Sequence, residues 1–575
     1  MTHPQNFATA DPALVNVLSR LLDAGQLAWL TPHLDELGAL AATDIDAAAR
    51  TADVNPPTLR QWDPAGERVD EVVHHPAYRH LEEIAYGRFG LAAMSHRPGV
   101  LGCATLAPHV AKYALSYLFV QSEFGLACPL SMTDSAARVL RLFDEEKYAE
   151  AISRLTATDR DGAWTGAMFM TERAGGTDLA QTESLATDCG DHWQLSGRKW
   201  FASNVSADVI LTLAVVPGQG EGTRGLGMFY VPRTRADGSR NSYTIDRLKD
   251  KLGTRSMASG EVTLAGAWAQ PVGDLSRGFR QMAEMVNVSR LSNAMRSSAL
   301  MRRAVREAVD HARGRVVFGR PLFEQPLMRV TLLSLALQAE AAMTLVLETA
   351  AVLDAADAGD ATARKLIRIM TPLAKYTICK EGRRVTGEAM EVRGGNGYIE
   401  DWVDPRLVRD AHLPSIWEGS SNVIALDVLR CMRKEALHAT LTDHQVSRLE
   451  ELTGHDCAPG VAWLRSRWTG LRTRGDALLA LEPDRQEARV GTYARDLART
   501  SMATTLLVQA AHDLDRTGSH RTLLVAFSWI LALSGVPEDE LHAALDELGP
   551  IIDGGDVPAS SVKTLLDDAA WAADA

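Results

Sequence analysis

The sequence predicts a mainly helical α+β protein, with a β domain inserted between helical segments. Apolar residues recur every three or four positions from about residue 10 to 160. Short apolar runs separated by turn residues replace this pattern from Trp164 to about Val272, and a long helical pattern opens near Gly278. We therefore expect an N-terminal helical domain over 1–163, a central β domain over 164–275, a helical bundle over 276–440 and a helical extension over 441–575.

The N-terminal segment is rich in Ala and Leu, which is typical of packed helices. An insert from Val54 to Asp70 interrupts it with three prolines and one glycine, residues that helix interiors reject. We expect this insert to form a long ordered loop.

Runs such as VILTLAVV and LGMFYV predict the strands of the β domain. The helical pattern that follows ends at Gly314, and further helices are expected at about 326–357, 361–389, 405–413 and 420–436. The apolar stretch Leu523 to Val536 is shorter than the ~20 residues that span a bilayer, so it predicts a buried helix.

The chain of 575 residues carries 60 Lys and Arg against 73 Asp and Glu, a net charge of −13. This balance disfavours nucleic acids and anionic membranes as partners unless a local basic patch exists. The six cysteines lie far apart with no CxxC pair, so we expect buried reduced thiols and no metal site. The N-terminal residues lack the pattern of a signal peptide, which predicts a cytoplasmic protein without a membrane partner.

Common nucleotide and hydrolase motifs are missing from the sequence, including Walker A, HExxH and GxSxG. Two segments of the β domain instead suit a planar cofactor with a pyrophosphate. MFMTERAGGTD (168–178) ends an apolar run in a glycine turn that can approach a phosphate, and GRKWFASN (197–204) places aromatic and hydroxyl side chains at a strand end. Taken alone, these segments also fit an ordinary hairpin turn and aromatic core packing.

Three segments of the helical region have similar potential. RVVFGRPL (315–322) offers an arginine fork for a phosphate and a phenylalanine for stacking, and VRGGNGY (392–398) forms an open glycine turn. In SIWEGSSN (415–422), Glu418 stands beside Trp417, an apolar neighbour that can raise the pKa of a carboxyl group toward that of a general base. A solvated arginine and a loop carboxylate are the alternatives from local sequence.

In this order and spacing, the segments resemble the acyl-CoA dehydrogenase superfamily over about residues 50–436, and its AidB branch in particular. VNPP, HHPAY, RLKDKLGTRSMAS and QPLMR add to the resemblance. It implies bound FAD, with its flavin rim, ring and pyrophosphate contacted by Met170, Thr171, Gly176, Thr177, Phe201 and Ser203. It further implies a homo-oligomer, a dimer or a homotetramer built as a dimer of dimers. The residues that would hold the neighbour's FAD are Arg315, Phe318, Gly394, Gly395, Asn396 and Gly397, and those that would close over the cofactor are Ile416, Trp417, Gly419 and Asn422.

The activity implied is that of an FAD-dependent, acyl-CoA dehydrogenase-like oxidoreductase. Glu418 would remove the α-proton of an acyl thioester polarised by hydrogen-bond donors, and N5 of the flavin would accept the β-hydrogen as a hydride. Some family members carry the base on the long helix, immediately before an arginine, where this chain has Ser289 before Arg290. Glu418 is thus the base candidate.

Two alternatives remain open. The AidB branch is associated with DNA binding and alkylation protection through a basic C-terminal region, but residues 441–575 hold 12 Lys and Arg against 21 Asp and Glu, a net charge of −9. A stripe of eight arginines between Arg465 and Arg499 forms either a groove-binding surface or, as we expect, a solvated helix face with ordinary ion pairs. The other alternative is a flavoenzyme that oxidises a substrate without CoA.

Overall fold

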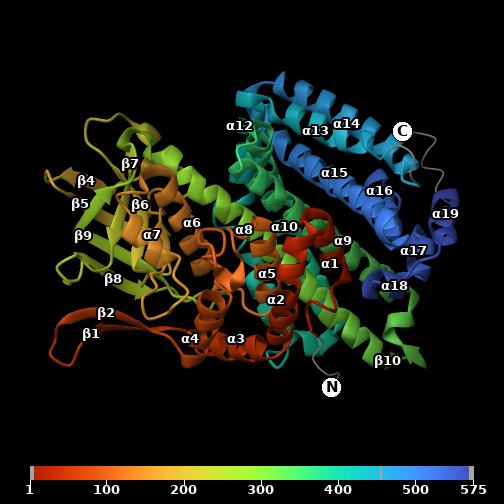
Figure 1. The fold of residues 1–575 in the computed structure, drawn as a ribbon, viewed down its shortest axis with the longest axis horizontal. Coiled ribbons are helices and arrows are strands. Elements are labelled where there is room, and N and C mark those ends of the chain that lie inside the picture. The colour runs from red at the N-terminus through yellow and green to blue at the C-terminus, as the bar shows by residue number, and fades with distance from the viewer. Residues whose placement is uncertain (1–5, 453–455, 569–575) are drawn as a thin grey trace. The chain divides into compact units, whose positions relative to one another are not determined.

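A computed structural model describes residues 6–452 and 456–568 (Figure 1). The chain divides into two compact units. The first unit comprises Met1–Ala42, His109–Gln121 and Asn293–Ala575, and the second comprises Thr43–Pro108 and Ser122–Ser292. Helix α8 (Gly278–Gly314) contributes residues to both units.

The first unit is helical, apart from one short hairpin. Its C-terminal extension is a series of helices, as the sequence predicts. The elements are α1 (Pro12–Leu21), α2 (Ala24–Ala42), α5 (His109–Val120), β10 (Val316–Val317), β11 (Arg320–Pro321), α9 (Pro326–Asp357), α10 (Ala361–Val392), α11 (Asp404–His412), α12 (Ser421–Glu435), α13 (Leu437–Glu450), α14 (Ala458–Leu479), α15 (Pro483–Thr517), α16 (Arg521–Ser534), α17 (His542–Asp546), α18 (Leu548–Asp553) and α19 (Ala559–Asp568).

The second unit combines helices with a sheet. Its elements are α3 (Asp44–Val54), β1 (Thr58–Trp62), β2 (Arg68–Val73), α4 (Pro76–Glu82), α6 (Ala127–Asp144), α7 (Ala149–Leu155), β3 (Gly166–Phe169), β4 (Leu185–Asp188), β5 (Trp193–Ser203), β6 (Val209–Val215), β7 (Leu226–Pro232), β8 (Tyr243–Leu248) and β9 (Ser259–Pro271). Together the two units confirm the predicted mainly helical α+β class.

The sheet of the second unit has seven strands, and its pairings close into a ring: β6 pairs with β7, β7 with β9, β9 with β5, β5 with β4, and β4 with β6. Strand β3 adds to β6 in parallel, and β8 adds to β9 in the antiparallel sense. Every residue of β7, and all but the last of β6, is buried, because both faces of these strands are covered. This explains why the two strands read as continuous apolar runs in the sequence.

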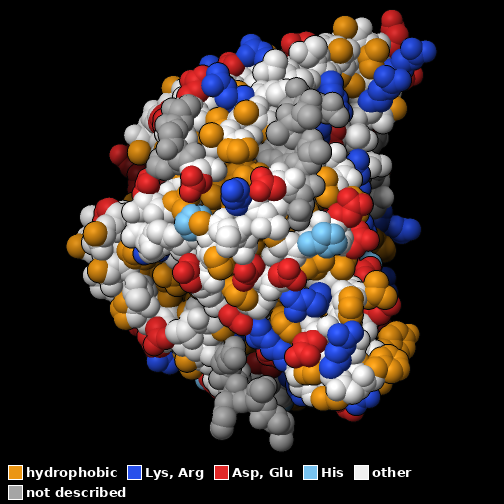
Figure 2. Space-filling view, turned by 90° about the vertical axis from the view of Figure 1, so that its right-hand side faces the viewer, with side chains coloured by type: hydrophobic (Ala, Val, Ile, Leu, Met, Phe, Trp, Pro, Cys, Tyr) orange, Lys and Arg blue, Asp and Glu red, His pale blue; other side chains and the backbone are white. Residues whose placement is uncertain are grey.

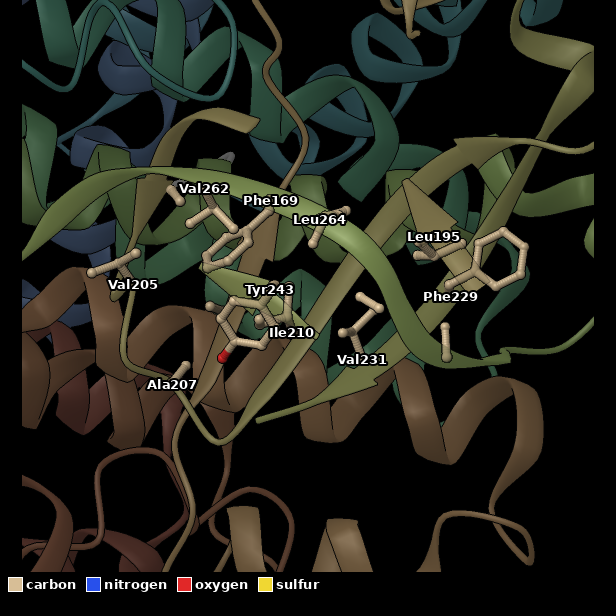
Figure 3. Close-up of a cluster of buried hydrophobic side chains, with 14 of the residues drawn as sticks. Phe169, Leu195, Val205, Ala207, Ile210, Phe229, Val231, Tyr243, Val262 and Leu264 are labelled. Atoms are coloured by element: carbon tan, nitrogen blue, oxygen red, sulfur yellow. The ribbon is translucent and has the colours of Figure 1, made fainter. Parts of the chain in front are cut away.

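Side chains from most of these strands meet in one hydrophobic cluster (Figure 3). Phe169, Ile210 and Phe229 lie in it with exposures of at most 1%. Val205 and Ala207, from the segment between β5 and β6, are also fully buried. The cluster fixes the positions at which β3 and β5 end, and both strand ends belong to the candidate site.

The insert between α3 and α4 is a β-hairpin, so its prediction as a loop was wrong. Strands β1 and β2 pair in antiparallel register around a turn in which Gly66 adopts a positive φ of 86°. The hairpin is fixed to strand β8, because the Gln61 side chain donates to the main-chain oxygens of Ile245 and Asp246 (3.1 and 3.2 Å). The prolines stand before and between the strands, where no ladder hydrogen bond is lost.

Helix α9 is long and apolar enough to cross a membrane by length and composition, but most of its apolar stretch is buried within the protein. The predicted buried helix over 523–536 is confirmed by α16, in which Leu523 to Leu531 are buried. Among the described residues, the cysteines form no disulfide. Cys189 is exposed and Cys103 half-buried, so the expectation of buried thiols is wrong for these two, because both lie near turns.

Candidate active site

In the second unit, the predicted cofactor residues gather at the ends of β3 and β5. Met170 and Thr171 directly follow β3, and the Trp200 amide of β5 donates to the Thr171 main-chain oxygen (2.8 Å). The Glu172 amide donates to the Gly175 oxygen (2.8 Å), which closes the turn that leads to Gly176 and Thr177, both exposed. Two sequence segments that are 29 residues apart are thus joined at one sheet edge.

Phe201 and Ser203 lie at the end of β5 and are accessible. Phe201 is 54% exposed, although its ring is apolar and its neighbour Ala202 is fully buried. The Ser203 hydroxyl lies 3.3 Å from the Ser259 hydroxyl of β9. An exposed aromatic ring beside a hydroxyl group suits the face of a planar ligand.

A buried ion pair supports these strand ends. The Lys199 Nζ donates to the Glu172 carboxylate (2.6 Å) and to the Leu213 main-chain oxygen (3.0 Å), and both side chains are at most 2% exposed. Glu172 also accepts from the amides of Glu183 (2.7 Å) and Ser184 (3.2 Å). Burial alone would raise the pKa of Glu172, but the Lys199 ammonium group and these donors hold the pKa below its ordinary value.

Cations surround the aromatic pair of β5. The Lys249 ammonium group lies 3.4 Å from the Trp200 ring centroid and 4.9 Å from that of Phe201. The Arg173 guanidinium group lies 5.2 Å from the Trp200 ring. Glu261 accepts from Lys249 (2.5 Å), so one of these cations is partly neutralised. Both cations lie in quoted sequence segments, Arg173 in MFMTERAGGTD and Lys249 in RLKDKLGTRSMAS, but the sequence alone did not assign a role to either.

In the first unit, Glu418 lies in the loop between α11 and α12. Its φ is +54° and that of Gly419 is +94°, so two successive residues adopt the left-handed region. For a residue with a Cβ this conformation costs of the order of 1–3 kcal/mol, and such strain is concentrated at functional sites. Glu418 is half-buried, and its neighbour Ile416 is 60% exposed.

Three buried side chains hold this loop. The Lys375 Nζ of α10 donates to the main-chain oxygens of Trp417 (2.6 Å) and Gly419, which flank Glu418. The Trp417 indole N–H donates to the Asn293 side-chain oxygen, and the Arg296 guanidinium group lies 4.9 Å from the Trp417 ring. Lys375, Asn293 and Arg296 are at most 2% exposed. Sequence reasoning did not select these three residues, although a lysine on the apolar side of a helix is itself a signal.

Arg315 and Phe318 belong to the short hairpin that follows α8. Phe318 is 99% exposed and has a φ of +50°, and Gly319 follows with +84°, so the two residues form the turn that joins β10 to β11. Leu327, at the start of α9, is 84% exposed. Both apolar side chains are therefore accessible to a ligand or a partner.

The glycine turn after α10 spans Gly394–Tyr398. A Cβ on Gly397 would lie 2.2 Å from the Met390 main-chain oxygen, so no larger residue fits there. Gly394, Gly395 and Asn396 are exposed. The buried Arg393 anchors the turn, because its guanidinium group donates to Asp404 (2.8 Å) and Glu307 (2.7 Å).

The structure assembles the predicted site residues in four places: the ends of β3 and β5, the Glu418 loop, the β10–β11 hairpin and the glycine turn. Asn422 is exposed in the first turn of α12, directly after the Glu418 loop. Ser289, at the position of the alternative base, is buried in α8. The roles of these residues remain predictions.

The arginine stripe of the C-terminal extension is partly neutralised. Arg465 pairs with Glu450 (3.4 Å), Arg472 with Asp443 (2.5 Å) and Arg474 with Asp496 (2.9 Å). Basic and acidic side chains are also interspersed on the face of the molecule that Figure 2 shows. These ion pairs agree with the expected solvated helix face and leave fewer charges for phosphate contacts.

Comparison with known proteins matches this architecture. Three family models cover most of the chain: the adaptive response protein AidB N-terminal domain over residues 2–162, the acyl-CoA dehydrogenase middle domain over 167–267 and the acyl-CoA dehydrogenase C-terminal domain over 276–432. AidB of Escherichia coli (strain K12) is 37% identical over 444 residues, which cover 75% of this chain and 79% of AidB. Acyl-CoA dehydrogenase family member 11 of Caenorhabditis elegans is 35% identical over 433 residues, which cover 73% of this chain and 69% of the relative.

Solved structures show the same similarity. The crystal structure of Caenorhabditis elegans ACDH-11 in complex with C11-CoA has a TM-score of 0.84 at 29% identity and covers 95% of both chains. The apo-form of Bd2924 has a TM-score of 0.78 at 32% identity and covers 87% of this chain and 98% of its own. The chain belongs to the acyl-CoA dehydrogenase superfamily of enzymes. Within it, the N-terminal match and the identity to AidB define an AidB-like member.

Proposed function

We propose that this protein is an FAD-dependent oxidoreductase that dehydrogenates an acyl thioester, with Glu418 as the base for the α-proton. The observation that supports the proposal is the Glu418 loop. Glu418 is half-buried there, and its backbone adopts the left-handed region. The buried Lys375 binds the main-chain oxygens of Trp417 and Gly419, which lie on either side of Glu418. Such a loop presents one carboxylate in a defined direction, as proton abstraction at carbon requires.

The side chains at the ends of β3 and β5 fit a flavin. Phe201 offers an exposed aromatic face, Ser203 a hydroxyl group, and the turn to Gly176 and Thr177 offers accessible main-chain amides. Lys249 and Arg173 add positive charge beside Trp200. We propose that Met170, Thr171 and these residues hold FAD, which supplies the acceptor for the hydride leaving the β-carbon.

The protein's own contribution to the chemistry is proton transfer. The α C–H bond breaks, the carboxylate of Glu418 takes the proton, and the electron pair of that bond forms the new double bond as the β-hydrogen leaves with its electrons. Because a thioester α-proton is only weakly acidic, hydrogen-bond donors at the carbonyl oxygen must lower the barrier further. A relative was crystallised with C11-CoA, and we propose an acyl-CoA as substrate here.

We further propose a cytoplasmic homo-oligomer. Phe318 and Leu327 are 99% and 84% exposed, and Tyr398, the last residue of the glycine turn, is 80% exposed. A partner subunit that covers these side chains would place Arg315, Phe318 and the turn from Gly394 to Gly397 in contact with its own cofactor. The burial of such side chains is a usual source of association free energy.

Anaerobic titration of the purified holoprotein with acyl-CoAs of increasing chain length tests the proposed function. Bleaching of the visible flavin absorbance by at least one of them is expected. Glu418→Gln should retain FAD and lose bleaching, whereas Glu435→Gln, an exposed glutamate at the end of α12, should behave as the wild type. A flavin that no acyl-CoA reduces, or an equally fast Glu418→Gln variant, would overturn the proposal.

A further inference from the structure

We infer that Lys375 is a positioning residue, which sets the direction of the Glu418 carboxylate by binding the main chain on both sides of it. Lys375 lies inside α10 and is 2% exposed. Its Nζ donates to the Trp417 oxygen (2.6 Å) and to the Gly419 oxygen. A buried ammonium group therefore has main-chain oxygens of the candidate base loop among its partners.

These two oxygens bracket the strained part of the loop. The Trp417 oxygen belongs to the peptide bond before Glu418, and the Gly419 oxygen to the peptide bond after Gly419. The backbone dihedral angles of Glu418 and Gly419, with φ values of +54° and +94°, lie between them. Because one cation fixes both carbonyl directions, rotation within the loop requires at least one of these hydrogen bonds to break.

Other contacts of the loop restrain its N-terminal side. The amides of Ile416 and Trp417 donate to the Leu413 oxygen (2.8 and 3.2 Å), and the Trp417 indole N–H binds Asn293. Lys375 connects this anchored side to Gly419, on the other side of Glu418. Its loss should make local opening of the whole loop easier, including the hydrogen bonds of the Ile416 and Trp417 amides.

The catalytic part of this inference rests on the proposed function, but the restraint of the loop does not. Displacement of a reacting group by about 1 Å can lower a rate by about 10²-fold. We therefore expect Lys375→Met to lower the rate of flavin reduction at saturating acyl-CoA by about 10²-fold, with little change in acyl-CoA affinity. A variant that is partly unfolded would instead lose both reduction rate and acyl-CoA affinity.

The test has two parts. The first measures the flavin reduction rate and the acyl-CoA affinity, and the second measures hydrogen–deuterium exchange of the peptide over 413–420 in the full-length holoprotein. We expect the amides of Ile416 and Trp417 to exchange about ten-fold faster in Lys375→Met than in the wild type, because local opening becomes easier. Two control variants should leave this exchange unchanged. Lys112→Met removes another buried lysine of the same unit, and Lys365→Met removes an exposed lysine of the same helix.

Each outcome has a distinct meaning. Faster exchange together with the rate loss supports the inference. Faster exchange in a protein whose flavin no acyl-CoA reduces supports the positioning role and overturns the proposed function. Unchanged exchange at 413–420, or the same acceleration in Lys112→Met, overturns the positioning role whatever the activity.

Discussion

The buried lysines Lys199 and Lys375 have different partners, and each supports a different part of the candidate site. Lys199 of β5 binds the Glu172 carboxylate, and the pair joins the ends of the strands that carry Thr171 and Phe201. Lys375 of α10 binds the main-chain oxygens of Trp417 and Gly419 in an irregular loop. The first interaction neutralises a buried charge with another charge, whereas the second sets an ammonium group against peptide dipoles.

The two regions are stabilised by different kinds of interaction. The strand ends are already fixed by ladder hydrogen bonds and by the cluster around Phe169 and Phe229, so the ion pair there adds to a rigid frame. The Glu418 loop has no ladder, and its left-handed backbone depends on hydrogen bonds to side chains. We therefore expect mutations to affect folding in the first region and geometry in the second.

The largest effect on stability is expected from Lys199→Met. It leaves the Glu172 carboxylate buried without its ammonium partner, and breaking such a pair typically costs about 3–5 kcal/mol. Lys375→Met leaves neutral carbonyl groups behind, for which a cost of about 1–3 kcal/mol is expected. Denaturant unfolding of the holoprotein measures both, with Arg198→Met, an exposed neighbour in β5, as the control. Equal losses in the two lysine variants would contradict the comparison.

The buried carboxylate of Glu348 makes the stability of the protein depend on pH. Burial alone would raise the pKa of Glu348, but the guanidinium groups of Arg448 and Arg20 hold it at about 2. Because this value is depressed, the stability is present above the unfolded value of 4.5 and is lost as the pH falls toward 2. Glu348→Gln should cost about 3 kcal/mol at pH 7.

Unfolding midpoints of the wild type and Glu348→Gln should therefore converge as the pH is lowered from 5 toward 2. Glu381→Gln, which removes a partly exposed partner of Arg384, serves as the control and should change the midpoint little at any pH. A constant difference between wild type and Glu348→Gln over this range would refute the assignment of the charge.

Asn293→Ala tests the other side-chain anchor of the Glu418 loop. The substitution removes the side-chain oxygen that accepts from the Trp417 indole N–H. The free energy of unfolding is expected to fall by about 1–3 kcal/mol. Because Lys375 still brackets Glu418, flavin reduction should fall less than in Lys375→Met. Stopped-flow measurement of the flavin reduction rate in both variants checks this order. A larger loss of rate in Asn293→Ala than in Lys375→Met would contradict it.

The smallest effect on the fold is expected from Phe318→Ser. The side chain is 99% exposed, so the stability of the subunit should change by less than about 0.5 kcal/mol. Assembly should weaken instead, together with retention of FAD. Sedimentation velocity at several protein concentrations measures this, and an unchanged assembly would remove Phe318 from the proposed contact surface.

Much of the fold could be predicted because its signals are local. Helix α8 has the predicted bounds, Gly278 and Gly314, and the apolar runs of the β domain became buried strands. The β1–β2 hairpin could not be predicted from its prolines alone, because its stability comes from contacts with β8. A turn at Pro64 and Gly66 between two β-prone runs was the missed signal.

The candidate site was less predictable than the fold. Motifs identified Glu418 and Phe201, but Lys375 and Asn293 lie 43 and 125 residues before Glu418, and only folding brings them to its loop. The positive φ of Glu418 could not be predicted, because residues other than glycine rarely adopt it and no sequence pattern marks it. The burial of Lys199 could not be predicted either, because its partner Glu172 lies 27 residues before it and meets it only in the folded sheet.

The central claim is that Glu418 removes the α-proton of an acyl thioester. Exchange of the α-hydrogens of an acyl-CoA with D2O, in the presence of the holoprotein, tests it directly if the β-carbon of the acyl chain carries no hydrogen. Such a compound cannot be oxidised, so only proton transfer is observed. We expect exchange with the wild type and a rate about 10³-fold lower with Glu418→Gln. Equal exchange rates in the two proteins would contradict it.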